Sequence, residues 1–197
     1  MRTSLRETLL AMQERDLCLR AELEADGTLF DGYHPRMEAV HRDNARQLRN
    51  ILERFGWPNE RLAGRDGAEA AWLTAQHSIS EPDFMRHCCE LLEREAASGS
   101  VPQWQHAYLE DRIRVSEGRS QRFGTQFDLT PEGPKLYEVE DINALDQLRQ
   151  RVGLGPVAAQ LERMAKEPLP TPAEYAAKKK AESEWRAKVG WREPREA

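Results

Sequence analysis

The sequence predicts a mainly α protein of the α+β class, namely a multi-helix bundle with one β-hairpin after the fifth helix and a polar C-terminal helix. Apolar residues recur at spacings of three and four over most of the first 118 residues, which is typical of amphipathic helices. Around residues 121–140 the pattern alternates, and the turn sequence TPEG interrupts it. We expect one domain over residues 1–168, followed by a proline-rich linker and a helix over residues 169–197.

The first two helices are predicted from their apolar seams. The first spans residues 4–25 and stops before Gly27. The second begins at Pro35 and ends with the sequence GWP, in which Gly56 takes the usual position of a C-terminal glycine. Its apolar stripe consists of Met37, Val40, Leu48, Ile51, Leu52 and Phe55.

The remaining elements follow from cap and turn residues. Asp66 and Glu69 form a predicted capping box for a third helix, and Ser80 caps a fourth. A fifth helix runs from Pro102 to Gly118. After the hairpin, Asp141 caps a sixth helix within INALDQLRQRVGL, and GPVAAQLERMAK forms a seventh. The last helix, around residues 172–189, is polar and is expected to pack weakly or against a partner.

Composition excludes several classes of protein. The longest apolar run is far shorter than the roughly 18 residues of a membrane span, and the N-terminal residues do not resemble a signal peptide. The net charge of -5 argues against a nucleic-acid partner. Three cysteines, two of them adjacent, form neither a disulfide framework nor a zinc spacing. We therefore expect a soluble cytoplasmic protein that binds neither nucleic acid nor membranes.

Several polar residues lie on the predicted apolar seams. A single polar residue on a seam often fixes helix register. An unpaired buried carboxylate costs several kcal/mol or more, however, so two of them call for partners. The simplest explanation is that the helices face one shared polar cavity. The seam residues are Asp16, His41, Asn44, Gln76, Asp111 and Arg112, with His77 on the flank of the third helix.

This cavity has the residues of an acid/base site. We predict His77 and Asp111 as the catalytic pair, because a carboxylate orients an imidazole and raises its pKa toward neutrality. Arg112 and Gln76 would position the substrate or an oxyanion. The opposite side would be lined by Asp16, His41 and Asn44. Two His and two Asp could instead ligate a metal. No HExxH or Glu-x-x-His pattern supports this, so we assign no metal ligand, and the sequence identifies no cofactor.

The segment EGRSQRFGTQF is either a simple turn into the hairpin or one wall of the cavity. On an alternating strand Gln121 and Thr125 share one face, and Gln126 lies on the other. Only one of the two glutamines can therefore point inward, unless a bulge intervenes at Gly124. All three polar residues are candidate substrate contacts.

The sequence elements around Gln76, Asp111 and Gln121 together resemble an uncharacterised bacterial domain family of unknown function. The resemblance runs from about Met12 to Leu154, and it implies no activity. Phe123 stands where that family usually has tyrosine. The motifs are a Trp-Leu-x-x-Gln-His element (Trp72, Leu73, Gln76, His77), an Asp-Arg pair (Asp111, Arg112) and a Gln-Tyr-Gly-Thr-Gln-like element (Gln121, Gly124, Thr125, Gln126).

Two classes of function remain open. The first is an enzyme of hydrolase or transferase type that acts on a small molecule or peptide. The second is a non-catalytic binding, immunity or regulatory module whose polar pocket sets specificity. A purely structural polar network is a third interpretation.

Overall fold

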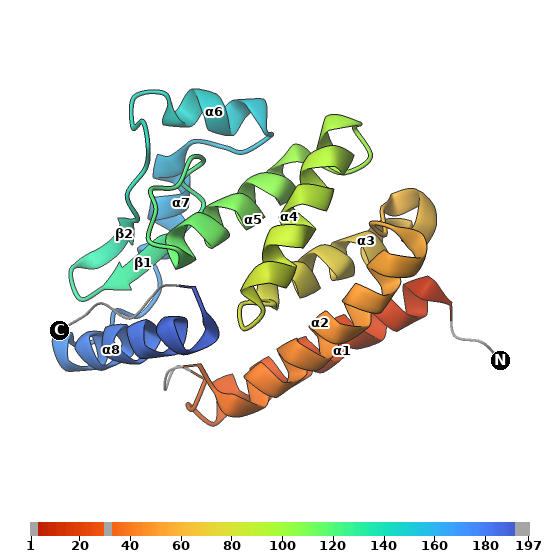
Figure 1. Cartoon of the computed structure of the whole chain (residues 1–197). Coiled ribbons are helices and arrows are strands. Elements are labelled where there is room, and N and C mark those ends of the chain that lie inside the picture. The colour runs from red at the N-terminus through yellow and green to blue at the C-terminus, as the bar shows by residue number, and fades with distance from the viewer. Residues whose placement is uncertain (1–3, 30–32, 192–197) are drawn as a thin grey trace. The chain divides into compact units, whose positions relative to one another are not determined.

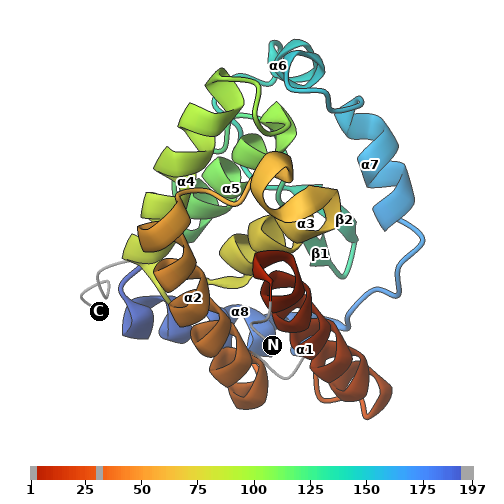
Figure 2. The same cartoon turned by 90° about the vertical axis from the view of Figure 1, so that its right-hand side faces the viewer.

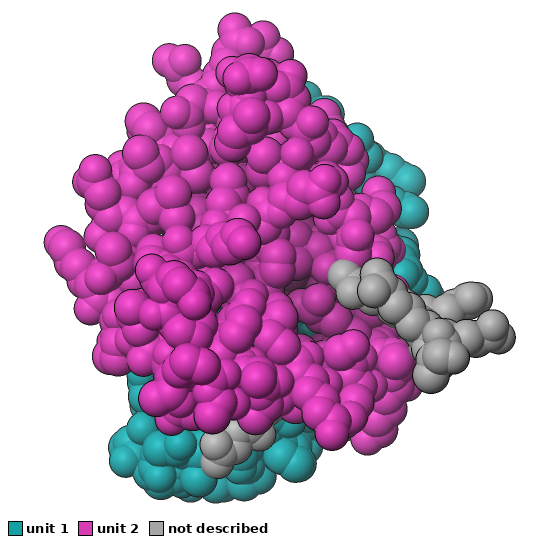
Figure 3. All heavy atoms as spheres, turned by 90° about the vertical axis from the view of Figure 1, so that its left-hand side faces the viewer, with its two compact units in different colours: residues 1–101 teal, residues 102–197 magenta. Residues whose placement is uncertain are grey.

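The computed structural model describes residues 4–29 and 33–191, and it divides into two compact units (Figure 3). The first is Met1–Val101 and the second Pro102–Ala197. The predicted boundary between residues 168 and 169 therefore falls inside the second unit. Within the described ranges, no helix is both long and apolar enough to cross a membrane.

The first unit consists of helices, as predicted (Figure 1). Figure 2 shows α1, α2 and α3 packed beside one another, and α1 contacts both of the others. The helices are α1 (Leu5–Ala25), α2 (Pro35–Phe55), α3 (Glu60–His77) and α4 (Pro82–Ala97).

The predicted seams of α1 and α2 form the core of this unit. Leu9, Met12 and Leu48 are fully buried where the two helices face α3. Phe55 was wrongly placed on the buried stripe, because it is 49% exposed. It is the last residue of α2, and the guanidinium of Arg54 lies over its ring.

Two predicted helix caps were wrong. Helix α3 begins at Glu60, with Asn59 as its cap, and Gly64 interrupts it with a φ of 71°. Asp66 pairs with the guanidinium of Arg6 on α1. Ser80 does not cap α4, because its hydroxyl donates to Glu38 on α2. In both cases the side chain that local spacing predicted as a cap contacts a residue of another helix.

The second unit contains the predicted hairpin after the fifth helix. The antiparallel strands pair from Phe127 with Leu136 to Thr130 with Gly133, so TPEG forms the turn as predicted. The hairpin is shorter than the predicted 121–140, because residues 121–126 form a loop. The elements are α5 (Gln103–Ser116), β1 (Phe127–Thr130), β2 (Gly133–Leu136), α6 (Leu145–Arg151), α7 (Val157–Met164) and α8 (Pro172–Val189).

Polar contacts hold the turn before α6 and helix α8 in this unit. The Asp141 carboxylate caps a turn that precedes α6, not the helix itself, because it accepts the N–H groups of residues 143 and 144. Helix α8 has no buried side chain, in line with its predicted polar character. Asp128 on β1 accepts hydrogen bonds of 2.9 Å from the Tyr175 hydroxyl and the Lys179 ammonium. Polar contacts therefore tie α8 to the hairpin.

Gly124 ends any strand character before β1, because its φ is +59°. A Cβ added there would lie 3.1 Å from both terminal methyl groups of the buried Leu145. We expect Gly124→Ala to lower the free energy of unfolding by about 2–3 kcal/mol, measured by urea denaturation, since backbone strain and overpacking add.

Gly153→Ala is the matched control for this substitution. Gly153 also has a positive φ, of 80°, but a Cβ there meets no atom within 4 Å. Gly153→Ala should therefore lower the free energy of unfolding only by the cost of backbone strain, without overpacking. Equal losses of free energy for the two variants would mean that the Leu145 side chain moves aside without an energetic cost.

Candidate functional site

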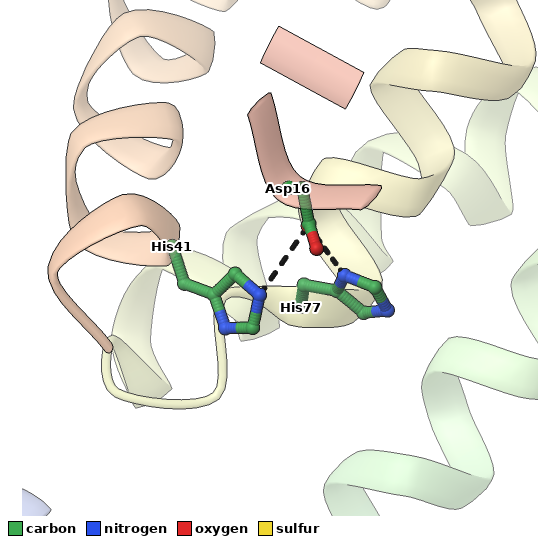
Figure 4. Close-up of side chains that lie close together, drawn as sticks. All are labelled: Asp16, His41 and His77. Atoms are coloured by element: carbon green, nitrogen blue, oxygen red, sulfur yellow. Dashed lines mark hydrogen bonds and ion pairs between the residues drawn. The ribbon is translucent and has the colours of Figure 1, made fainter. Parts of the chain in front are cut away.

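Three side chains from three helices of the first unit meet at one point (Figure 4). Asp16 comes from α1, His41 from α2 and His77 from the last position of α3. Asp16 and His41 occupy seam positions, so the packing that buries the apolar seams also buries these two groups. The helices thus hold a carboxylate and two imidazoles together on rigid backbone.

Asp16 is the centre of this cluster. Its Oδ2 lies 2.6 Å from Nδ1 of His77, which donates a hydrogen bond, and 3.3 Å from Nε2 of His41. The two imidazole rings have centroids 4.9 Å apart. The side chains of Asp16 and His41 are 2% and 8% exposed, whereas that of His77 is 21% exposed. Solvent therefore reaches the cluster at His77.

The electrostatics favour an ionised Asp16. Burial raises the pKa of its carboxyl, but the contacts with His41 and His77 outweigh burial and hold the pKa well below its usual range. Its second oxygen, Oδ1, is buried and has no hydrogen-bond partner among the described residues. A buried carboxylate oxygen without a partner is costly, so this atom calls for an explanation.

Tyr33 completes the surroundings of His41. Its hydroxyl lies 2.6 Å from Nδ1 of His41, and this contact turns Nε2 of the ring toward Asp16. Burial raises the pKa of Tyr33 far above its usual range, so the hydroxyl remains protonated. The sequence did not predict Tyr33, because it precedes α2 and lies on no seam; its only signal was an aromatic residue with a hydroxyl directly before the α2 cap.

Two other predicted residues of this unit differ in their roles. The Asn44 amide donates to the Met12 carbonyl at 3.0 Å and accepts from Arg15 at 2.9 Å, so it joins α2 to α1. The Gln76 side chain is buried, and neither its oxygen nor its nitrogen has a hydrogen-bond partner in the described chain. Gln76 therefore keeps its full capacity to bind a ligand, whereas Asn44 does not.

In the second unit Asp111 organises the loop after α5. Its carboxylate accepts the backbone N–H groups of Arg122, Phe123 and Thr125 at 2.7 to 3.1 Å. The Thr125 hydroxyl adds a fourth donor at 3.0 Å. Burial raises the pKa of Asp111, and these hydrogen bonds oppose it. The predicted residues Asp111 and Thr125 thus meet each other, and both are used in holding this loop.

The choice between the two glutamines is resolved within the same loop. Gln121 is fully buried, and its amide donates to the carbonyls of Gln126 and Tyr137 at 3.0 Å. Its oxygen accepts the Gln126 N–H at 2.9 Å. The Gln126 side chain is partly exposed and donates to the Thr125 hydroxyl. Gln121 therefore points inward and supports the loop.

Arg149 on α6 supports this loop from the other side. It is 2% exposed and donates to the carbonyls of Phe123 and Gly124 at 2.8 Å and of Gly155 at 2.7 Å. The sequence did not predict this role. The available signal was its position four residues after the apolar Leu145, on the inward face of a predicted helix.

It remains a prediction that His77, Asp111 and Arg112 form one catalytic site. The carboxylate hydrogen-bonded to His77 is Asp16, which the sequence had placed on the opposite wall. Arg112 is partly buried, burial lowers its pKa, and its Nε has no hydrogen-bond partner among the described residues. One donor of the buried Arg112 guanidinium is therefore unsatisfied among the described residues.

Comparison with known proteins identifies the family of the chain. No curated protein and no solved structure is significantly similar to this chain. A model of a family of unknown function, DUF6624, matches residues 3–167, a range that includes the Asp16 cluster and the Asp111 loop. The match covers most of the 197 residues, and the chain belongs to this family of unknown function, DUF6624.

Proposed function

We propose that this protein is an enzyme of hydrolase or transferase type that acts on a small molecule or peptide, with its reactive centre at Asp16, His41 and His77. The observation that carries the proposal is a buried carboxylate in contact with two imidazoles, one of which is reached by solvent. An imidazole held by a buried carboxylate is a common means of taking a proton from water or a hydroxyl.

Several buried polar groups of the first unit are not satisfied as in a structural network. Desolvating a carboxylate is costly, and a structural role requires that all its hydrogen bonds be made. Oδ1 of Asp16 and both amide atoms of Gln76 instead have no hydrogen-bond partner in the described ranges. A bound substrate or cofactor would supply these partners. We assign Gln76 to substrate binding for this reason.

The loop of the second unit has polar groups of its own. Asp111, Gln121 and Thr125 hold this loop, and Nε of Arg112 has no hydrogen-bond partner among the described residues. A guanidinium with an unsatisfied donor favours an anionic group, such as a carboxylate or phosphate.

A non-catalytic binding module is the second candidate. The unpartnered atoms of Gln76 and Arg112 favour it, because such groups bind a ligand without any chemistry. In that case the protein would retain a polar ligand and transform none.

The test compares variants in an activity screen over esters, amides, phosphoesters and glycosides. We expect the activity found with the wild type to fall by about 100-fold or more in His77→Gln, because proton-transfer groups contribute about 10²–10⁴. Urea denaturation checks that the variant is folded, since glutamine keeps an N–H donor for the buried Asp16 carboxylate that His77 contacts.

His87→Gln on α4 is the matched control, because its imidazole is exposed and lies outside the cluster. It should keep full activity. A His77→Gln variant that is fully active would contradict the proposal. A wild type that turns over no substrate but binds a polar ligand would establish the binding module instead.

A further inference from the structure

We propose that Asp16, His41 and His77 form a binding site for a divalent transition-metal ion of the zinc class. The role of this ion in catalysis rests on the proposed function. The binding of the ion does not, because it is measured independently of activity. One ligand atom from each residue lies within 4.8 Å of the others, and the three come from three different helices. Imidazole nitrogens and a carboxylate oxygen are the ligands that Zn²⁺ takes from proteins.

The two distances from Asp16 to the histidines require only small adjustments. Zinc binds nitrogen and oxygen at about 2.0–2.2 Å, so two ligand atoms in a tetrahedral site lie about 3.4 Å apart. The separation of 3.3 Å between Nε2 of His41 and Oδ2 of Asp16 already fits. The 2.6 Å hydrogen bond from His77 to Asp16 would lengthen by less than about 1 Å as the ion replaces its proton.

A second observation points to a ligand at this place. Oδ1 of Asp16 and Nε2 of His41 are both buried and have no hydrogen-bond partner among residues 4–29 and 33–191. Both residues are more than nine-tenths buried, and both side chains point toward the space shared with His77. An ion would bind the imidazole lone pair and balance the charge of the carboxylate.

Tyr33 provides the outer support that histidine ligands usually have. Its oxygen lies 2.6 Å from Nδ1 of His41, where it can accept the Nδ1–H proton and leave the Nε2 lone pair for the ion. An ion bound at Nε2 would fix the tautomer in which Nδ1 of His41 donates to the Tyr33 oxygen.

Three protein ligands leave one position for water or a substrate. Structural zinc sites normally have four protein ligands, whereas catalytic sites have three and an open position. The partial exposure of His77 gives that position access to solvent. With the ion bound, His77 would be a ligand in place of the proton acceptor, and the ion would supply the activation by lowering the pKa of its bound water.

The test is titration of the chelator-treated full chain with Zn²⁺ in a calorimeter, supported by the visible spectrum of the Co²⁺ form. We expect one ion per chain. Asp16→Asn, His41→Gln and His77→Gln should each weaken binding by at least 100-fold, and Tyr33→Phe by about 10-fold. His87→Gln should leave the affinity unchanged, and so should a double replacement of Cys88 and Cys89 by Ala.

Failure of the ion site is distinguishable from failure of the enzyme proposal. Circular dichroism of each metal-free variant shows whether it is folded, and a bound ion should raise the melting temperature of the wild type only. Absence of stoichiometric binding, or binding that survives all three ligand substitutions, would overturn the metal site. Activity that survives chelation yet is lost in His77→Gln would overturn it too, and would leave the proton-transfer centre intact.

Discussion

Asp111→Ala is expected to lower the free energy of unfolding by about 3–5 kcal/mol, among the largest stability losses of any single substitution in this chain. The buried carboxylate accepts three backbone N–H groups and one hydroxyl, and alanine leaves these donors without a partner. Urea denaturation followed by circular dichroism measures the loss. Hydrogen exchange at Arg122, Phe123 and Thr125 should accelerate even under native conditions.

Two further substitutions separate this effect from a general loss of charge on α5. Glu110→Ala removes the neighbouring, partly buried acid, whose partners Arg114 and Arg122 both keep Glu140, and should cost less than Asp111→Ala. Asp111→Asn keeps the shape but replaces one acceptor with a donor, so its loss should be intermediate. If Asp111→Ala costs no more than Glu110→Ala, the carboxylate does not hold the loop.

The helical part of the fold could be predicted because helix spacing is a local property. The seams of α1 and α2 predicted which faces are buried, and they included Asp16, His41 and Asn44. A seam defines a face, but not which residues of three different helices meet at the same height. For this reason the sequence placed Asp16 opposite His77, whereas the two are hydrogen-bonded.

The loop of the second unit could be predicted only in part. The burial of Asp111 followed from its position on the α5 stripe, but its partners are backbone N–H groups, and no residue pattern records these. Alternation implied a strand through residue 126, and the left-handed conformation of Gly124 prevents it. Arg149 was missed because a charged residue on a short helix is normally exposed.

The two polar clusters differ in how completely they are satisfied. In the second unit, the hydrogen bonds of Asp111, Gln121 and Arg149 are made within the loop and its neighbours. In the first unit, Asp16 and His41 keep buried atoms without hydrogen-bond partners in the part of the chain described. A satisfied network stabilises a fold, and an unsatisfied one is tolerated where a ligand binds. This contrast supports placing the chemistry at Asp16.

Arg149→Met should also destabilise the protein by about 3–5 kcal/mol. Methionine keeps the apolar stem in place but removes the donors to the buried carbonyls of Phe123 and Gly124 and to that of Gly155. Arg149→Lys should recover only part of the loss, because an ammonium cannot reach three carbonyls in the geometry of a guanidinium. Equal stability of the Lys variant and the wild type would contradict this account.

The strongest form of this prediction is the double variant of Asp111→Ala and Arg149→Met. Asp111 binds the N–H groups of the loop and Arg149 its carbonyls, so each side chain needs the other to keep the loop in place. Once one is lost, the loop relaxes and the second loss costs less. We expect the double variant to be more stable than the sum of the single losses by about 1–3 kcal/mol. Strict additivity would show that the two residues stabilise separate parts of the second unit.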